Sequence, residues 1–383
     1  MFYLSLFAIT SVLFYFAQKF EQKGAFVLFN ILSATAIILL AFVAGCRDNT
    51  IGVDIKVYGI KTFNLALGSK DFWEGFAGSR RELGYYAINY IASRFSSKIG
   101  LSFFLQNLTQ HIFVFWGMKY YMKQIPLWLS MLIYQLYFYN LTLNLMCQGI
   151  ALGFLIWSFK YVVERNFVRL LLCSVVCFFL HKSSAVAFLI LFFITWVMGK
   201  QPKERIKYIV LTVIGGVVVL VFFTILLRLV SSAIPGMEYF VMYGGEPGKR
   251  GGGFEGNVPL TDVVMRLAML FVALVCVRGR QSSIDSLHLF IFVVIFDLIT
   301  LMFGRYAYFA TRLCYYFFIC DMVLFLKLII SESRVTIRSR TFISLSLLSI
   351  ILFCCIKWNL IMNYPSTYPY TSEFLGIGTI NGY

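Results

Sequence analysis

Long apolar segments separated by short polar ones run along the chain from Phe2 to Met362. A helix needs about 20 mostly apolar residues to cross a hydrocarbon core of roughly 30 Å, and the hydropathy pattern predicts about twelve such spans. Backbone groups in lipid must be paired internally, and these apolar runs are too long and too little alternating for barrel strands. The expected fold class is therefore all-α: a polytopic transmembrane helical bundle that forms a single integral membrane domain, 1–383. We place the spans near 2–17, 25–45, 100–118, 127–142, 147–163, 169–181, 184–198, 208–232, 263–277, 287–303, 312–330 and 341–362.

The composition agrees with a membrane protein and excludes a soluble globular one. Hydrophobic residues make up 60% of the chain and charged residues 13%, with a mean hydropathy of +0.82, whereas a soluble chain is about one quarter charged. The net charge of +16 would suggest a nucleic-acid partner in a soluble protein. Here the charges lie between the spans, where basic residues set the topology, so the expected partner is the lipid bilayer and no nucleic acid.

The distribution of charge between alternate loops predicts the orientation. One set of loops is basic, and the other set holds most of the acidic residues. By the positive-inside rule the basic loops are cytoplasmic, which places both chain ends outside. Three long segments then lie outside: a first loop 46–99, a glycine-rich second loop 233–262 and a tail 363–383. The basic loops carry Lys19, Lys23, Lys119, Lys123, Lys160, Arg165, Arg169, Lys200, Lys203, Arg205, Lys207, Arg278, Arg280, Arg334, Arg338 and Arg340.

Within the first outer loop, residues 82–95 show a helical period with a polar opposite face. The segment is too short to span a bilayer, so a helix at the outer interface is expected. The nine cysteines lie mostly inside predicted spans and show no zinc-ligand spacing with histidines. We therefore expect no metal and no cofactor.

The densest polar group follows the second span and contains Arg47, Asp54 and Tyr58. An arginine at the membrane–water boundary can hold a diphosphate bidentately, because its charge is delocalised and permanent. Asp54 and Tyr58 are one helical turn apart and could face one ligand together. The alternative is an interfacial loop in which Arg47 pairs with Asp48 or Asp54.

Two further groups lie at outer turns. His181 lies between two short apolar segments, where it could accept a proton or serve as a hydrogen-bonded turn residue. Asn140, Asn144 and Gln148 follow each other at intervals of four residues. Such a polar stripe either binds helices together or lines a hydrophilic cavity, and the pattern does not separate these two roles.

Arginines and tyrosines flank the junction of the tenth and eleventh spans: Arg305, Arg312, Tyr315 and Tyr316. Guanidinium groups beside aromatic rings suit an anionic glycolipid, while an interfacial aromatic belt is the alternative. Asp297 and Asp321 fall near the middle of consecutive spans. Ionisable residues at that depth indicate a proton path or a buried ion pair, and pairing with Arg266 or Lys327 is favoured.

These features share one predicted face of the membrane. A transporter would hold its polar site near the midplane between related halves, and we find no internal repeat. The one-sided grouping therefore favours an enzyme. The residues on that outer face are Arg47, Asp54, Glu82, Gln148, His181, Arg305 and Arg312.

The same residues resemble the EpsG family, a branch of the Wzy-type polysaccharide polymerases. The resemblance covers nearly the whole chain in element order, although each motif is weak alone. One departure stands out: Cys147 occupies the position before Gln148 where the family usually has an arginine. The matching elements are Arg47, then Gly52 to Tyr58 (G-x-D-x-x-x-Y), Glu82 to Tyr85, Asn144 to Ala151, His181 to Ser183, and Arg312 to Phe317.

The resemblance implies an O-antigen, capsule or exopolysaccharide polymerase in the bacterial inner membrane, with its active site facing outward. Its substrates would be undecaprenyl-diphosphate-linked oligosaccharides, and a chain-length regulator is a possible partner. Arg47 and Arg312 would hold diphosphate with support from Arg305, while Asp54, Glu82 and His181 are unranked candidate bases. The remaining residues expected to bind substrate are Tyr58, Asn144, Gln148, Tyr315 and Tyr316.

Three other functions remain open from the sequence. A lipid-linked oligosaccharide flippase would have a similar number of spans. A membrane O-acyltransferase would modify the surface glycan without changing its length. A structural subunit of an export complex would tolerate alanine at the outer arginines. The identity and linkage of the sugars are not encoded in any recognisable pattern.

Overall fold

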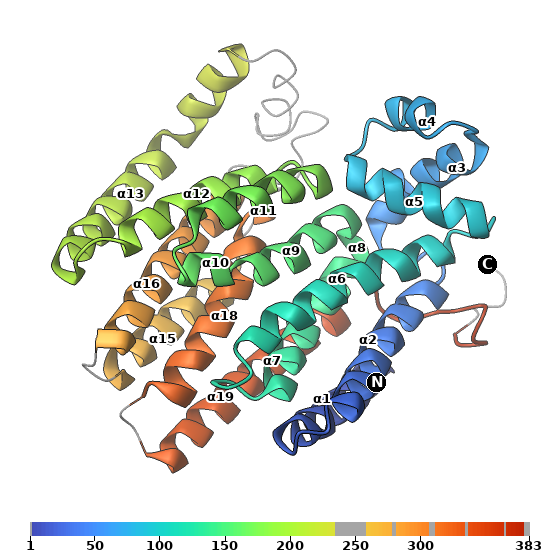
Figure 1. Cartoon of the computed structure of the whole chain (residues 1–383). Helices are drawn as coiled ribbons and strands as arrows, with labels where there is room; N and C mark the ends of the chain where they lie inside the picture. Colours follow the sequence, from blue (N-terminus) through green and yellow to red (C-terminus); the bar gives the residue numbers. More distant parts are fainter. Residues whose placement is uncertain are drawn as a thin grey trace. The chain divides into compact units, whose positions relative to one another are not determined.

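The structure, a computed structural model, describes residues 2–233, 258–277, 281–305, 311–333, 336–363 and 365–378 (Figure 1). Most of the predicted second outer loop, 233–262, lies outside these residues. The described chain is mostly helical, and it divides into two compact units. Unit 1 comprises residues 1–160, 171–182 and 337–383, and unit 2 comprises residues 161–170 and 183–336. The all-α fold class is confirmed.

The helices of unit 1 follow the predicted spans closely. Its membrane helices pack as neighbours, with α1 along α2, α2 along α6, and α6 along α9 (Figure 1). The short helices α3, α4 and α5 form the predicted first outer loop. The bounds are α1 (Phe2–Gln22), α2 (Phe26–Cys46), η1 (Ile55–Gly59), α3 (Ile60–Gly68), α4 (Phe72–Ser79), α5 (Leu83–Phe95), α6 (Gly100–Tyr120), α7 (Leu127–Tyr134), η2 (Gln135–Tyr139), α8 (Asn140–Asn144), α9 (Met146–Ser158), α10 (Lys160–Val163), α11 (Phe167–Leu180), α19 (Ile337–Cys355) and η4 (Ile356–Ile361).

Unit 2 is organised around α16, which packs against α12, α13, α15 and α18. At one end of α16 the carboxylate of Asp285 pairs with Arg165 at 3.1 Å and with Arg205 at 2.5 Å. The helix α11 begins in this unit and continues into unit 1. The remaining bounds are α12 (Ser184–Met198), α13 (Pro202–Ala233), α15 (Leu260–Cys276), α16 (Gln281–Met302), η3 (Phe303–Arg305) and α18 (Cys314–Ser331).

Seven helices of the described chain are long and apolar enough to cross a membrane. The protein is thus a multi-pass membrane protein, while the count of about twelve spans stays a prediction. Two further predicted spans, α11 and α12, are apolar but shorter. The seven are Phe2–Gln22, Phe26–Cys46, Met146–Val163, Pro202–Phe222, Ser283–Arg305, Cys314–Ser331 and Ile337–Cys355.

Polar side chains bind the helices of unit 1 together. The amide of Gln110 in α6 donates to Thr142 Oγ1 at 2.8 Å and also to the Tyr134 hydroxyl. Such bonds are favourable in lipid because an unpaired polar group there is costly. Close backbone approach adds to this: a Cβ on Gly100 would lie 2.6 Å from the carbonyl oxygen of Gly45. These two glycines let α2 and α6 meet immediately before Arg47.

Candidate functional site

Arg47 follows the last residue of α2, and its extended backbone ends that helix. Its side chain is 4% exposed, and its guanidinium carbon lies 4.3 Å from the centre of the Phe103 ring. Within the described part of the chain, none of its three side-chain nitrogens has a hydrogen-bond partner. It forms no ion pair with Asp48 or Asp54 there. A buried cation without an anion is costly, and an anionic ligand would supply the acceptors that these nitrogens lack.

Residues 365–378 pack against the end of α2 (Figure 1). The Tyr370 hydroxyl donates to the Val43 carbonyl at 2.9 Å, and its ring stacks on Phe2 at 4.2 Å. The Ser372 hydroxyl donates to the Cys46 carbonyl at 2.6 Å. We name this the 365–378 segment. It fixes the backbone that carries Arg47.

A hollow of about 1450 Å³ opens beside Arg47, between the end of α2, the start of α6, α3 and the 365–378 segment. Burial lowers the pKa of Arg47 to about 10, against the opposing effect of nearby tyrosines, so the residue stays cationic at neutral pH. The hollow combines charged and apolar walls, as an amphiphilic anion requires. The charged residues that line it are Arg47, Asp48, Lys98 and Glu373, and the apolar ones include Phe42, Phe104 and Phe374.

The predicted Gly52–Tyr58 element forms a tight turn into η1. Gly52 has a φ of +99°, and a Cβ there would lie 3.3 Å from the Cα of Asn144. Asn144 accepts a hydrogen bond from the backbone N–H of Asp54 at 3.0 Å. The Tyr58 hydroxyl donates to the Asp54 carboxylate at 3.1 Å. The structure therefore brings Asp54, Tyr58 and Asn144 together. The spacing of the sequence predicts the pairing of Asp54 with Tyr58 but not the contact with Asn144.

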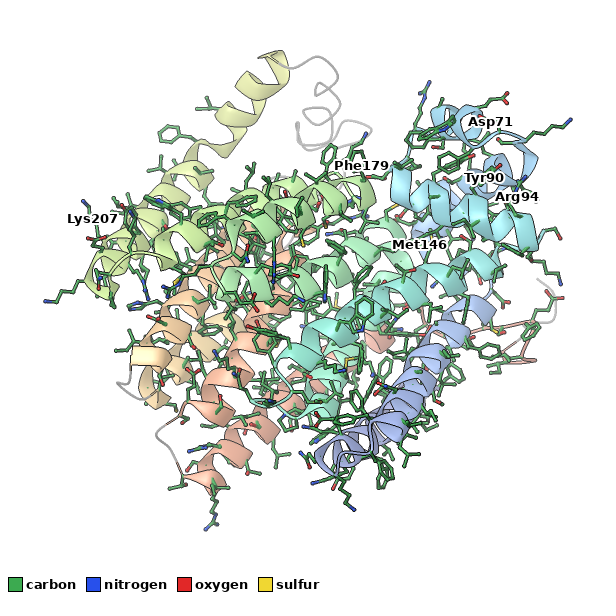
Figure 2. All side chains as sticks on the ribbon, in the orientation of Figure 1. Asp71, Tyr90, Arg94, Met146, Phe179 and Lys207 are labelled. Atoms are coloured by element: carbon green, nitrogen blue, oxygen red, sulfur yellow. The ribbon has the colours of Figure 1, made fainter. Side chains whose placement is uncertain are left out.

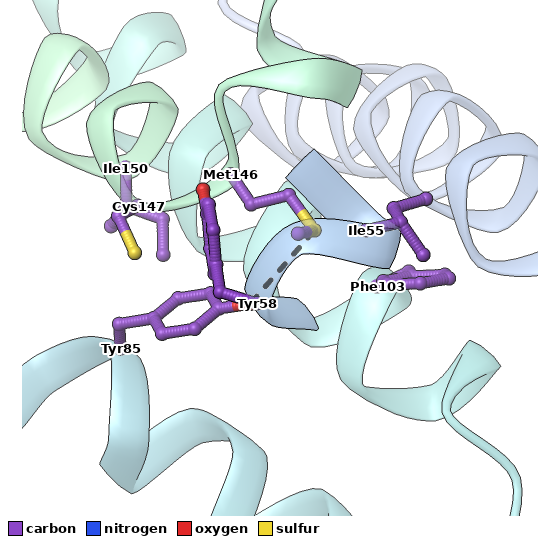
Figure 3. Packing of buried hydrophobic residues seen from close by; sticks show 7 residues of the cluster. All are labelled: Ile55, Tyr58, Tyr85, Phe103, Met146, Cys147 and Ile150. Atoms are coloured by element: carbon purple, nitrogen blue, oxygen red, sulfur yellow. Dashed lines mark hydrogen bonds between the residues drawn. The ribbon is translucent and has the colours of Figure 1, made fainter. Parts of the chain in front are cut away.

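Tyr58 belongs to a buried cluster with Ile55, Tyr85, Phe103, Met146, Cys147 and Ile150 (Figure 3). The Tyr58 and Tyr85 rings meet edge to face at 5.7 Å, and the Tyr85 hydroxyl contacts the Met146 sulfur at 3.9 Å. Burial, Cys147 and Asp54 raise the pKa of Tyr58 well above 10, so its hydroxyl keeps the proton that it donates to Asp54. Cys147 is buried in this apolar setting.

Arg81, which the sequence patterns do not single out, lies against the same cluster. Its guanidinium carbon is 4.2 Å from the centre of the Tyr58 ring. The cluster thus carries a cation on two of its rings, Arg47 on Phe103 and Arg81 on Tyr58. Arg81 thus places a positive charge against the same cluster that contains Cys147. Arg81 and Tyr58 belong to different elements, so the spacing of neighbouring residues in the sequence does not predict their contact.

Glu82 precedes α5 and pairs with His181, which follows α11. The His181 Nδ1 lies 3.0 Å from Glu82 Oε1, and both side chains are mostly buried. Burial raises the pKa of Glu82, but His181 and the backbone amides of Glu82 and Lys182 outweigh burial and lower it to about 2. The ionised Glu82 accepts the Nδ1 proton, which leaves Nε2 of His181 as the basic nitrogen.

The helices α4 and α5 belong to the predicted first outer loop, 46–99. The predicted helix within residues 82–95 is confirmed as α5, although it buries Tyr85 and Asn89 and exposes Phe95. Asp71 caps α4 by accepting from the backbone N–H groups of Trp73 and Glu74. Tyr90 and Arg94 of α5 lie together, with 4.5 Å between guanidinium carbon and ring centre (Figure 2).

The stripe predicted for Asn140, Asn144 and Gln148 is interrupted. Leu145 has a φ of −84° and a ψ of 61°, so the helix breaks between α8 and α9. Asn140 donates to Thr367 Oγ1 of the 365–378 segment at 3.1 Å, whereas Asn144 holds Asp54. Gln148 is buried in α9. Asn140 therefore binds the 365–378 segment, and Asn144 binds the turn at Asp54.

The other four predicted site residues belong to unit 2 and are described within it. Arg305 ends η3 and is exposed, and Arg312 precedes α18 and is half-buried. Tyr315 and Tyr316 lie in the first turn of α18 and are buried. The Tyr316 hydroxyl lies 3.4 Å from the Ser183 hydroxyl.

The fold and the site define a multi-pass all-α membrane protein. Beside an amphiphilic hollow it has a buried cation that no described residue pairs with. The chain belongs to the EpsG family, whose family model matches residues 30–372. Members of this family are Wzy-type polymerase-like proteins, which places the chain in membrane polysaccharide biosynthesis. Comparison with curated proteins and with solved structures gave no significant match.

Proposed function

We propose that this protein polymerises lipid-linked oligosaccharides at the outer face of a bacterial inner membrane. The observation that carries the proposal is Arg47, a buried guanidinium whose three nitrogens lack partners in the described chain. A diphosphate would supply the oxygen acceptors that these nitrogens need. The apolar walls of the adjoining hollow, including Phe42 and Phe374, suit the polyprenyl chain of the same ligand.

The Glu82–His181 pair would provide the base. In the proposed reaction a hydroxyl of the acceptor sugar attacks the anomeric carbon of the donor sugar. The new C–O bond forms as the bond to the lipid diphosphate breaks, and the hydroxyl proton passes to Nε2 of His181. Glu82 holds the imidazole in the required tautomer. Asp54 suits the base role less, because Tyr58 already occupies its carboxylate.

Positive charge must meet the diphosphate as it leaves. Arg47 would bind it, and Arg81 would add a second cation on the neighbouring face of the aromatic cluster. Arg312, with Arg305 in support, is proposed to contact the second lipid-linked substrate, with Tyr315 and Tyr316 beside it. Undecaprenyl is the proposed lipid, and Gln148 of α9 is proposed to bind substrate.

Purified protein in proteoliposomes with a synthetic polyprenyl-diphosphate oligosaccharide tests the proposal. We expect elongated products, seen by mass spectrometry, and their loss in the Arg47→Ala variant. Translocation of the substrate without elongation would support a flippase instead. Acyl transfer to the sugar at unchanged length would support an O-acyltransferase. Either result would overturn the polymerase assignment.

A further inference from the structure

Unit 2 contains a buried cluster of charges that the proposed reaction does not use. Arg266 of α15 donates from Nε to Asp297 Oδ2 at 2.5 Å and from Nη2 to Asp297 Oδ1 at 3.3 Å. Its Nη1 donates to the backbone carbonyl of Asp262 at 3.0 Å, and its guanidinium carbon lies 4.0 Å from the Phe318 ring centre. The arginine and Asp297 are both fully buried, so this is a bidentate ion pair inside a membrane unit.

Asp321 of α18 adds a second carboxyl to this pair. It is fully buried, and neither of its oxygens has a hydrogen-bond donor in the described part of unit 2. Asp321 lies one helical turn after Phe318, the ring that Arg266 contacts, and α18 packs along α16, which carries Asp297. The carboxyl of Asp321 therefore faces the Arg266–Asp297 pair and interacts electrostatically with Asp297. Lys327, the other cation considered from the sequence, pairs with Glu332 at 3.2 Å instead.

Two facts then determine the protonation of the cluster. One guanidinium and two carboxylates would leave a net negative charge in a buried site between helices, where charge is strongly disfavoured. A contact between two carboxyl groups is attractive only when one of them carries a proton, because an ionised carboxylate has no donor. We infer that Asp297 and Asp321 form a proton-binding site, with the proton held on Asp321 and donated to Asp297.

With this proton the cluster has no net charge. The positive charge of Arg266 and the negative charge of Asp297 cancel, and Asp321 is an uncharged carboxylic acid. The proton comes from solvent and converts the carboxylate to a carboxylic acid with no other bond change. The alternative occupant is a monovalent cation such as sodium. The titratable and charged groups that face the pair are Asp262 and Arg266 of α15 and Cys314 and Cys320 of α18.

Infrared spectroscopy tests the inference directly, because a protonated carboxyl has a C=O stretching band that an ionised one lacks. We expect this band from the full-length protein at neutral pH, with an isotope shift in heavy water. It should disappear in Asp321→Asn and also in Asp297→Asn, because the single carboxyl left beside Arg266 then ionises. The matched control is Asp285→Asn, which removes a carboxylate from an arginine-paired site and should leave the band unchanged.

Arg266→Gln gives the opposite signature. Without the cation both carboxyls should be protonated, so the band should roughly double in intensity. An asparagine amide resembles the protonated acid in size and can also donate a hydrogen bond, so Asp321→Asn should unfold within about 3 °C of the wild type. The inference fails if the wild type lacks the band or if both asparagine variants retain it. It also fails if the band is seen only after sodium has been replaced by potassium, because sodium would then be the occupant of the site. None of these readouts depends on polymerase activity.

Discussion

The imidazole of His181 and the carboxylate of Glu82 form a hydrogen-bonded pair, with 3.0 Å between Nδ1 and Oε1, although 99 residues separate them in the chain. The pair joins the start of α5 to the end of α11 within unit 1. A carboxylate in this position selects one tautomer of the ring and stabilises the imidazolium that forms when Nε2 takes a proton.

Removing either member of this pair should slow elongation by roughly 100-fold or more. His181→Ala removes the base, and Glu82→Gln removes the anion that orients it, so the double variant should be no slower than His181→Ala alone. Initial rates with a lipid-linked oligosaccharide provide the measurement. Glu74→Gln, an exposed acid of α4, is the matched control. Independent, multiplicative effects would show that the two side chains do not act as a unit.

The same pair predicts a pH dependence of stability. Folding lowers the pKa of Glu82 from 4.5 to about 2, so its carboxylate contributes stability that is fully present above pH 4.5 and is lost as the pH falls toward 2. The unfolding temperature of the wild type in detergent should exceed that of Glu82→Gln most at neutral pH. This difference in unfolding temperature should become smaller as the pH falls from 4.5 toward 2. A margin independent of pH would contradict the pairing.

Replacing Arg47 by methionine should stabilise the protein while abolishing polymer formation. The guanidinium is buried without a partner in the described chain, so an apolar side chain of similar length removes a desolvation cost of about 1 to 4 kcal/mol. Unfolding in detergent and the length of the surface glycan provide the two readouts. Lys98→Met changes an exposed cation of the same hollow and should not raise stability. A less stable Arg47→Met would mean that Arg47 has a structural role.

Arg81→Ala should weaken substrate binding by roughly 10- to 100-fold, the range expected for one charged hydrogen-bonding group. Arg81→Lys should restore only part of the binding, because an ammonium group lacks the planar guanidinium that binds phosphate through two N–H donors. The measurement is KM for the lipid-linked substrate. The neighbouring exposed Arg80, changed to Gln, is the control. Equal effects at positions 80 and 81 would indicate a general surface charge.

Tyr370 should be important for the stability of unit 1. Tyr370→Phe removes the bond to the Val43 carbonyl and should cost about 1 kcal/mol. Tyr370→Ala also removes the ring that stacks on Phe2 and should cost about 3 to 5 kcal/mol. Phe374→Ala changes a mostly exposed ring of the same segment and is the comparison variant. Equal losses from Tyr370→Ala and Phe374→Ala would contradict this account.

Local periodicity was sufficient to predict several parts of the site. The four-residue spacing of Asp54 and Tyr58 places them on one side of a helical turn, and the structure joins them by a hydrogen bond. That they face one ligand stays a prediction. The helical period within residues 82–95 predicted α5. Both are short-range properties, set by the 3.6-residue repeat.

Long-range contacts could not be read in this way. Arg81 lies in a polar loop without any period, and its contact with Tyr58 depends on how α5 packs against η1. The 365–378 segment is neither apolar enough nor regular enough to predict a packed element, and it is fixed by bonds to the end of α2. The break at Leu145, by contrast, falls in the turn that the hydropathy pattern places between the spans 127–142 and 147–163.

The contact between the 365–378 segment and α2 affects the order in which parts of the protein fold during synthesis. Ser372 bonds to Cys46 across 326 residues of chain, and the whole of unit 2 is encoded between them. A ribosome that adds about 5 to 20 residues per second needs tens of seconds to travel that distance. During this interval the backbone before Arg47 lacks its partner, so the nascent protein is inserted in the membrane well before its site is formed.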